Sequence, residues 1–280
     1  MVMTRRDASG KTKIAGIFGY PVEHSLSPLM HNAAFNSMGL DICYVAFKVF
    51  PQDLSDAVKA VRALNMLGVN ITVPHKEKVI PLLDRVDKEA SFIGAVNTIV
   101  NSEGKLTGYN TDGKGFMHSL SEEGISVGGK DILIIGAGGA SRAISYYLRE
   151  KTSKLFLYDI DKQKAEKLLS DLKKISNNVF LLEDIKNINK PHIIINATPL
   201  GLKVDDPLPL NPDFIAPDMV VCDLIYKNTR FLQEANKKGA KTIDGSGMLL
   251  WQGVLAFELW TGIKPPVDVM RKALMSGINK

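Results

Sequence analysis

The sequence has few cysteines and no long apolar run, and each shortage excludes a class of protein. Only two cysteines occur, Cys43 and Cys222, far apart and each within an apolar segment. Such a pair indicates buried free thiols in a reducing compartment and not a disulfide framework. No run of about 18 or more apolar residues is present, and the first residues lack the apolar core of a signal peptide. We therefore expect a cytoplasmic protein with no membrane partner.

An excess of charge of one sign is also missing. The 35 basic residues nearly balance the 30 acidic ones, and the net charge is +5. No basic face interleaved with aromatic residues is visible, so we expect no nucleic-acid partner. His, Cys and carboxylate residues do not have the spacing of a metal site, so we expect no metal. The small positive excess supports a mild attraction for anionic small molecules. We expect a small-molecule substrate and a monomer or homodimer.

Short apolar runs alternate with helical patterns, which predicts an α/β fold with a mostly parallel sheet. In the first part of the sequence, strands are expected at 13–20, 42–49 and 67–73, and helices at 27–39, 51–65 and 76–84. The pattern starts afresh near residue 117, where we expect a second α/β domain. The strongly apolar helical segment 247–266 is expected to lie across the boundary between the two domains.

A glycine-rich segment, "ILIIGAGGASRA", separates a predicted strand from a predicted helix. Gly136 permits a tight turn, Gly138 lets a pyrophosphate approach the backbone, and the helix N-terminus offers N–H groups to the anion. Ser141 stands where a third glycine is usual, and a small residue there still permits close packing of helix on strand. This setting predicts a Rossmann-type dinucleotide site. A glycine-rich turn without a ligand is the alternative.

The next predicted strand ends at Asp159, roughly 20 residues beyond the glycine loop, where an acid binds the adenosine ribose. Asp159 and Asp161 would repel the 2′-phosphate of NADP, and no arginine stands beside them. We therefore expect NAD as the cofactor. NADP is the alternative if Lys162 or Lys164 reaches the phosphate, and both acids could instead only cap the following helix.

Polar residues gather at four points where predicted strands end. The clusters are "EHSLSP" with Ser25 and Ser27, "NITVPHK" with Asn70, Thr72 and Lys76, "AVNT" with Asn97, and "YNTDG" with Asn110 and Asp112. Each alone fits turn chemistry, because Ser, Asn and Asp side chains bond to nearby backbone. Four such clusters at the carboxyl ends of strands indicate the ligand crevice of an open α/β sheet.

These motifs together closely resemble those of the shikimate dehydrogenase family. The matching segments, in the order that the family keeps, are "GYPVEHSLSPLMHN", "GVNITVPHKEKV", "GAVNTI", "GYNTDGKGF", "IIGAGGASRA", "INATPLGL" and "GSGMLLWQG". The resemblance implies a substrate-binding and catalytic domain at 1–116 plus 249–280, and a Rossmann dinucleotide-binding domain at 117–248. It also implies reversible reduction of 3-dehydroshikimate to shikimate, a step toward chorismate and the aromatic amino acids.

The same resemblance assigns roles to individual residues. The substrate carboxylate would be bound by Ser25, Ser27 and Tyr226, and the ring hydroxyls by Asn70, Thr72, Asn97 and Gln252. The cofactor would be bound by Gly136, Ala137, Gly138, Gly139, Ala140, Asp159, Asn196, Thr198 and Gly245. Lys76 and Asp112 would form the catalytic pair. An ammonium aimed at the ketone oxygen can stabilise developing charge and supply a proton, and a nearby carboxylate keeps it ionised.

One departure from the family concerns the cofactor. Many members carry an Asn-Arg-Thr stretch, which binds the 2′-phosphate, where this sequence has Asp159, Ile160 and Asp161. The absence of that stretch is similar to relatives that use NAD, some of which also oxidise quinate. Two alternatives therefore stay open. One is a quinate/shikimate dehydrogenase, and the other is a nucleotide-binding sensor that has kept the fold and lost the chemistry.

Three histidines adjoin the polar motifs. His75 is expected to be structural, because it neighbours Lys76, whose side chain should face the cleft. For His24 and His31, which flank the serine motif, we expect hydrogen bonds to the backbone.

Overall fold

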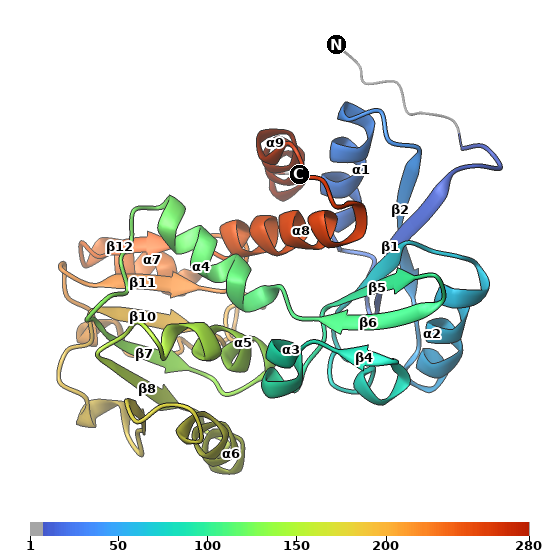
Figure 1. Ribbon diagram of the computed structural model, residues 1–280. Helices are drawn as coiled ribbons and strands as arrows, with labels where there is room; N and C mark the ends of the chain where they lie inside the picture. The colour runs from blue at the N-terminus through green and yellow to red at the C-terminus, as the bar shows by residue number, and fades with distance from the viewer. Residues whose placement is uncertain (1–7, 280) are drawn as a thin grey trace. The chain divides into compact units, whose positions relative to one another are not determined.

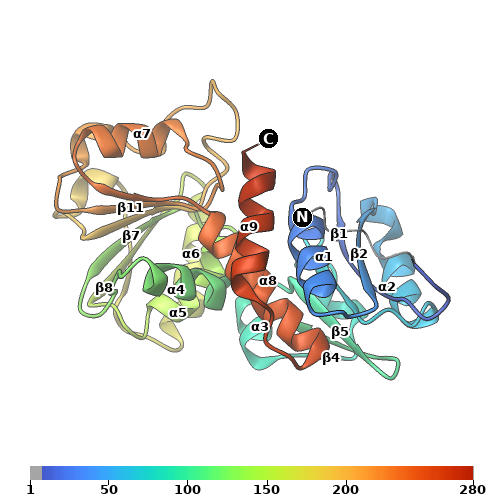
Figure 2. The same ribbon diagram turned by 90° about the horizontal axis from the view of Figure 1, so that it is seen from above.

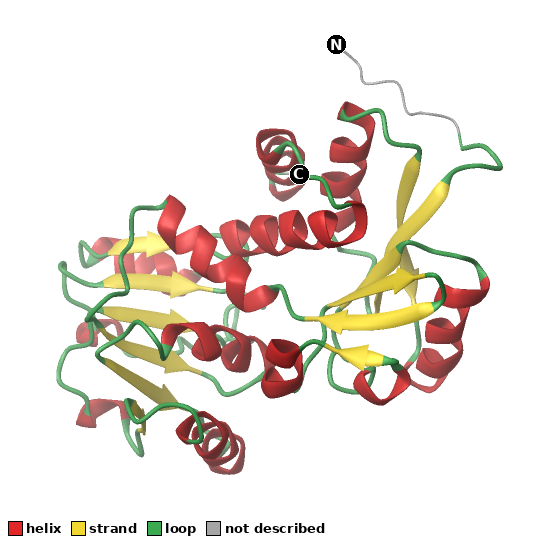
Figure 3. Ribbon diagram, viewed as in Figure 1, coloured by secondary structure: helices red, strands yellow, loops and turns green. Residues whose placement is uncertain are grey.

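The computed structural model describes residues 8–279, and the chain divides into two compact units (Figure 1). The first unit comprises Met1–Thr111 and Gln252–Lys280, and the second comprises Asp112–Trp251. These breaks lie a few residues from the expected boundaries. Each unit has its own sheet with helices packed on it (Figure 3), so the expected α/β class is confirmed. The roles of the two units as substrate and nucleotide domains stay predictions.

The sheet of the first unit has six strands: β1 Lys13–Gly19, β2 Ile42–Lys48, β3 Gly68–Ile71, β4 Arg85–Val86, β5 Thr98–Ser102 and β6 Lys105–Tyr109. Their order in the sheet is β2-β1-β3-β5-β6-β4. Strand β5 runs antiparallel to both of its neighbours, whereas the other pairings are parallel. The sheet is therefore mostly parallel, as expected, with its polar clusters at strand ends.

Helices cover both faces of this sheet. The helices of this unit are α1 Ser27–Ser37, α2 Leu54–Ala63, α3 Lys88–Ile93 and α9 Val267–Ile278, with 3-10 turns at Pro51–Asp53 and Ile80–Leu82, and α9 packs on α1. Figure 2 shows α1 and α2 on opposite sides of β1 and β2. Under α2, Val58 and Val61 belong to a buried cluster that includes Val69 and Ile99 of the sheet. This burial fixes the strands whose ends carry the polar residues.

The segment 76–84 does not form the expected α-helix. It consists of turns followed by the single 3-10 turn Ile80–Leu82. Pro81 explains the difference, because proline lacks an N–H and disfavours helical geometry at the residue before it. Lys76 therefore lies in a turn, and its carbonyl accepts a hydrogen bond from the N–H of Val96 at 2.8 Å.

The sheet of the second unit is wholly parallel. Its strands are β7 Asp131–Ile135, β8 Lys154–Tyr158, β9 Val179–Leu181, β10 Ile193–Asn196, β11 Val220–Asp223 and β12 Lys241–Ile243. The order β12-β11-β10-β7-β8-β9 is that of two mononucleotide-binding halves, which meet between β7 and β10. The Rossmann-type arrangement expected from the glycine loop is thus confirmed.

The helices of the second unit are α4 Asp112–Glu122, α5 Gly139–Leu148, α6 Lys162–Lys173 and α7 Arg230–Lys237, with 3-10 turns at Ile185–Asn187 and Pro212–Phe214. Figure 2 shows α7 on one side of the sheet and α5 on the other. Buried strand residues such as Leu133, Ile194 and Val221 pack with Phe231 of α7. The apolar strands therefore hold their polar ends at one edge of the sheet.

Helix α8, Ser246–Thr261, contains the break between the units, after Trp251. It is the apolar helix expected near the end of the sequence. Among residues 8–279, no helix combines the length and the apolarity that crossing a membrane requires.

Candidate active site

The glycine loop lies between β7 and α5, where the strand order of the second sheet reverses. Gly136 has a φ of +106°, and a Cβ there would lie 2.9 Å from the carbonyl oxygen of Ala197. Both facts require glycine at this position. At Gly138 and Gly139 a Cβ would meet no atom within 4 Å. The loop therefore leaves open space beside the N–H groups at the start of α5, which is what a pyrophosphate needs.

Asp159 holds this loop from the end of β8. One of its carboxylate oxygens accepts the N–H of Ala137 at 2.7 Å, and the other accepts the N–H of Asp161 at 2.8 Å. Asp161 caps α6 through the N–H of Lys164 and also forms an ion pair with the Lys164 ammonium at 3.1 Å. Ile160, between the two acids, is 90% exposed. The rim of the loop thus carries two carboxylates and an apolar side chain.

Asn196 and Thr198 shape the loop that follows β10. The Asn196 amide donates to the carbonyl of Leu200 and to Asp223, each at 3.1 Å. Its oxygen accepts both the N–H and the hydroxyl of Thr198. These four bonds use the full capacity of a buried amide. Asn196 therefore acts on the site through the shape of its loop.

Asp223 is a site-shaping residue that the sequence predictions missed. It ends β11, is 1% exposed, and accepts hydrogen bonds from Asn196, from the hydroxyl of Thr229 at 2.8 Å and from the N–H of Ile225. Burial raises the pKa of its carboxyl group. The loop that it anchors carries Tyr226, whose ring is 38% exposed. The signal was available, since Asp223 is a polar residue at the end of an apolar strand.

Gly245 packs against the same loop. Its N–H donates to the carbonyl of Ile225 at 3.0 Å, and a Cβ at this position would overlap the carbonyl of Leu224. Glycine is therefore required here for close approach between backbones.

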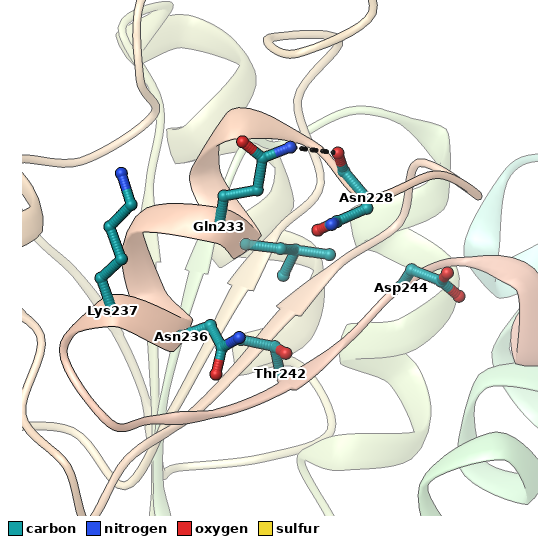
Figure 4. Close-up of a pocket in the computed structure, with 7 residues that line it drawn as sticks. Asn228, Gln233, Asn236, Lys237, Thr242 and Asp244 are labelled. Carbon is teal, nitrogen blue, oxygen red and sulfur yellow. Dashed lines mark hydrogen bonds between the residues drawn. The ribbon is translucent and has the colours of Figure 1, made fainter.

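A polar groove of about 500 Å³ lies nearby, over α7 and the end of β12 (Figure 4). In it the Gln233 side chain donates to the backbone carbonyl of Asn228 at 3.1 Å, which secures the start of α7. Asp244 comes from the segment that precedes α8. Neither Tyr226 nor Gly245 is among the lining residues, so the groove is separate from the predicted contacts.

In the first unit, the predicted substrate residues are joined by hydrogen bonds. The Asn70 oxygen accepts the Tyr44 hydroxyl at 2.7 Å, and the Asn70 amide donates to the Asn97 carbonyl and the Thr98 hydroxyl. The Asn97 side chain continues to Thr111, whose hydroxyl reaches the carbonyl of Gln252 at 3.1 Å. We refer to these six residues, with Ser27, as the polar cluster.

The polar cluster combines predicted and unpredicted residues. Ser27, Asn70, Asn97 and Gln252 came from the sequence motifs, whereas Tyr44, Thr98 and Thr111 did not. All seven are buried. Thr98 and Thr111 stood inside the motifs "AVNT" and "YNTDG" beside residues already chosen. Tyr44 lies in an apolar strand, and the residues beside it in the sequence did not indicate a polar role.

The serine motif begins α1. The Ser25 hydroxyl accepts the N–H of Ser27 at 3.3 Å, and Pro28 occupies the first turn of the helix. Ser27 is 4% exposed, whereas Ser25 is half-buried. Thr72, also half-buried, follows β3 and donates its N–H to the Phe18 carbonyl at 2.9 Å. A backbone N–H thus holds the Ser25 hydroxyl, and a backbone hydrogen bond fixes the peptide group of Thr72.

Lys76 and Asp112 belong to different units. Lys76 is half-buried in the first, next to His75, which is fully buried and bonded through Nε2 to the Val49 carbonyl at 2.8 Å. This contact agrees with a structural role for His75. Asp112 begins α4 in the second unit and is 6% exposed. A carboxylate at a helix N-terminus is stabilised by the helix dipole.

The expected backbone hydrogen bond of His31 is absent. Its ring is fully buried, and neither nitrogen has a hydrogen-bond partner among the described residues. It stacks instead on Tyr44, with ring centres 4.5 Å apart and planes 10° apart. Burial lowers the pKa of His31 to about 3. The prediction was wrong because the aromatic neighbours come from distant segments.

Two protein-family models match the sequence. The shikimate dehydrogenase substrate binding domain matches residues 17–99, and the shikimate 5′-dehydrogenase C-terminal domain matches residues 245–275. A shikimate dehydrogenase (NADP(+)) from Desulforamulus reducens is 46% identical over 97% of this chain and 98% of its own length.

Solved structures are similar over nearly the whole chain. Shikimate dehydrogenase from Aquifex aeolicus superposes with a TM-score of 0.90 at 44% identity, covering 95% of this chain and 98% of that one. Quinate dehydrogenase from Corynebacterium glutamicum in complex with NAD gives a TM-score of 0.89 at 31% identity, covering 95% and 99%.

Proposed function

This chain belongs to the shikimate dehydrogenase family, and we propose that it catalyses the reversible nicotinamide-dependent reduction of 3-dehydroshikimate to shikimate. The observation that carries the proposal is the polar cluster, in which Asn70 and Asn97, two of the residues assigned to ring hydroxyls, belong to one buried set of hydrogen bonds that also includes the backbone carbonyl of Gln252. Lys76 and Asp112, the implied catalytic pair, are both retained. A protein that only sensed nucleotide would have no need of either feature.

In the proposed reaction a hydride goes to the carbonyl carbon and a proton to its oxygen. The bound nicotinamide supplies the hydride. Lys76 stabilises the negative charge that develops on oxygen and delivers the proton, while Asp112 keeps the ammonium ionised and aimed. Oxidation reverses these transfers.

The remaining assigned residues orient the substrate. Ser25, Ser27 and Tyr226 bind its carboxylate, and Asn70, Thr72, Asn97 and Gln252 bind its ring hydroxyls. Hydroxyl and amide groups suit both tasks, because they form directional hydrogen bonds that leave few donors or acceptors without a partner.

We propose NAD as the preferred nucleotide. The glycine loop fits a dinucleotide because its space beside the start of α5 is open. A 2′-phosphate would face the carboxylate of Asp159, with the uncharged Ile160 where many relatives have arginine. The Lys164 ammonium is already paired with Asp161. The curated relative from Desulforamulus reducens is named for NADP(+), so the proposed preference would differ from the nucleotide in that relative's name.

A second candidate is a dehydrogenase that also oxidises quinate. The similarity to a quinate dehydrogenase in complex with NAD favours it, together with the acid at position 159. Shikimate and quinate share the carboxylate and ring hydroxyls that the proposed contacts bind. Comparing kcat/KM for the two substrates decides between one substrate and two.

The test of the proposed function is nucleotide reduction by the purified protein with shikimate as substrate. We expect turnover that depends on shikimate and is lost in Lys76→Ala. Nucleotide binding without turnover, unchanged by Lys76→Ala, would favour the sensor.

We also propose that the protein works in the cytoplasm as a monomer or homodimer. Cys222 is a buried free thiol, and burial raises its pKa to about 12. A free thiol suits a reducing compartment. Light scattering on the purified protein measures its mass in solution.

A further inference from the structure

Tyr44 is bonded to one of the proposed substrate contacts. It lies on β2, and its hydroxyl donates to the Asn70 oxygen at 2.7 Å. Burial raises the pKa of this phenol well above its usual range, so the hydroxyl keeps its proton. The phenol thus donates a hydrogen bond to a residue assigned to a substrate ring hydroxyl.

Tyr44 is itself held from two directions by α1. Its N–H donates to the side-chain oxygen of Asn32 at 2.8 Å, and its carbonyl accepts the Asn32 amide at 2.9 Å. The neighbouring His31 stacks against its ring at 4.5 Å, backed by Phe257 and Trp260. Because the ring and the peptide group of Tyr44 are both held in place, the position of its hydroxyl is also fixed.

The hydrogen bonds of Asn70 show how the Tyr44 hydroxyl orients its amide group. Both amide hydrogens of Asn70 are used, one by the Asn97 carbonyl and one by the Thr98 hydroxyl. The oxygen accepts Tyr44 and has a second lone pair left. Asn70 is therefore oriented to accept a hydrogen bond from a substrate hydroxyl and not to donate one.

We propose that Tyr44 is a positioning residue that sets the orientation of the Asn70 amide for the substrate. At 2% exposure it acts through this side chain and does not touch the substrate. The inference rests on the proposed function. It adds a residue from an apolar strand, β2, to the determinants of substrate affinity.

The test is Tyr44→Phe, which removes one oxygen and keeps the ring and its stacking. Loss of a buried hydrogen bond of this kind corresponds to about a tenfold rise in the KM for shikimate. We expect a change in kcat of no more than about twofold, because Lys76 is untouched. Nucleotide affinity should stay close to that of the unaltered protein, and the melting temperature should fall by a few degrees, because the buried Asn70 oxygen loses a partner. Tyr146→Phe, a phenol in the second unit, is the matched control and should leave KM unchanged.

A double-mutant cycle separates positioning from a general effect on folding. On an Asn70→Ala background, Tyr44→Phe should raise KM by a clearly smaller factor than it does alone, because the hydrogen-bond partner of the phenol is gone. Equal factors on both backgrounds, or an unchanged KM in Tyr44→Phe, would overturn the inference. An unaltered protein with no shikimate turnover would instead overturn the proposed function, and this inference with it.

A second variant covers the case in which Tyr44→Phe does not fold. Asn32→Ala releases the Tyr44 peptide group without altering the phenol, and it should raise the KM for shikimate in the same direction. Asn32→Asp keeps an acceptor for the Tyr44 N–H and should restore part of the affinity. If both Asn32 variants have the KM of the unaltered protein, Tyr44 does not position the site.

Discussion

The two units hold their candidate site residues in different ways. In the first, the side chains of Asn70 and Asn97 bond to those of Tyr44 and Thr111 within the buried polar cluster. In the second, the predicted contacts are mostly backbone groups of a glycine loop that other residues hold in shape. A small polyhydroxy acid is distinguished by hydroxyl positions, which needs fixed side chains, whereas a pyrophosphate is bound by N–H groups.

This difference predicts different mutational behaviour. Side-chain changes in the first unit should alter the KM for substrate or kcat. In the second unit, loop-shaping residues such as Asn196 and Asp223 should matter as much as any residue that touches the nucleotide.

Lys76→Ala should have the largest effect, since it removes the proposed acid from the first unit. General acid catalysis contributes about 10²- to 10⁴-fold, so kcat should fall by that order while substrate binding weakens little. Steady-state kinetics together with equilibrium binding of shikimate measures both quantities. Lys78→Ala, two residues along the same turn, is the control. A Lys76→Ala protein with near-normal kcat would remove Lys76 from the chemistry.

Cofactor choice is the next largest effect and belongs to the second unit. The double variant Asp159→Asn with Ile160→Arg should shift the ratio of kcat/KM values toward NADP by about 10- to 100-fold, because it replaces repulsion by a charged hydrogen bond. Ile175→Arg adds the same charge to another exposed position of that unit and should leave the ratio unchanged. An unmoved ratio in the double variant would mean that nucleotide choice is made elsewhere.

A change of pH tests whether the stability of the first unit depends on keeping the buried His31 ring neutral. Its folded pKa of about 3 lies below the usual 6.5, so the unfolded chain takes up the proton first as the pH falls. Stability is therefore complete above pH 6.5 and is lost toward pH 3, by about 2 kcal/mol between pH 7 and pH 5.

Denaturant unfolding at the two pH values measures this loss. In His31→Phe, which keeps an aromatic ring but cannot titrate, the dependence on pH should be smaller by that amount. His24→Gln, at an exposed position, should keep the full dependence. The same slope in His31→Phe as in the unaltered protein would contradict the buried neutral state.

Gly138→Ala should have the smallest effect. It tests whether the backbone of the glycine loop binds the pyrophosphate in the second unit. A Cβ at Gly138 meets no protein atom within 4 Å, so stability should hardly change. The methyl group would enter the space proposed for the pyrophosphate and raise the KM for nucleotide by about tenfold, at an unchanged KM for shikimate. Gly128→Ala, outside the loop, is the control. A normal nucleotide KM in Gly138→Ala would place the pyrophosphate elsewhere.

The sequence predicted those parts of the fold and site that have a local signal. The glycine loop, the alternating strands and the polar residues at the ends of β3 and β5 could be identified from short segments. Two failures have a cause in long-range structure, and a third is local. The role of Tyr44 depends on Asn70, 26 positions away, and the ring of His31 packs among aromatic residues that include Phe257. Segment 76–84 forms no α-helix because Pro81 lacks an N–H and disfavours helical geometry at the residue before it.

The most direct test of the central claim is the kcat/KM of the unaltered protein for NAD and for NADP at saturating shikimate. Shikimate-dependent turnover with a higher value for NAD is the expected result, because Asp159 and Ile160 leave no partner for a 2′-phosphate. A higher value for NADP would contradict the proposed reading of the loop rim, and no turnover with either nucleotide would contradict the proposed function itself.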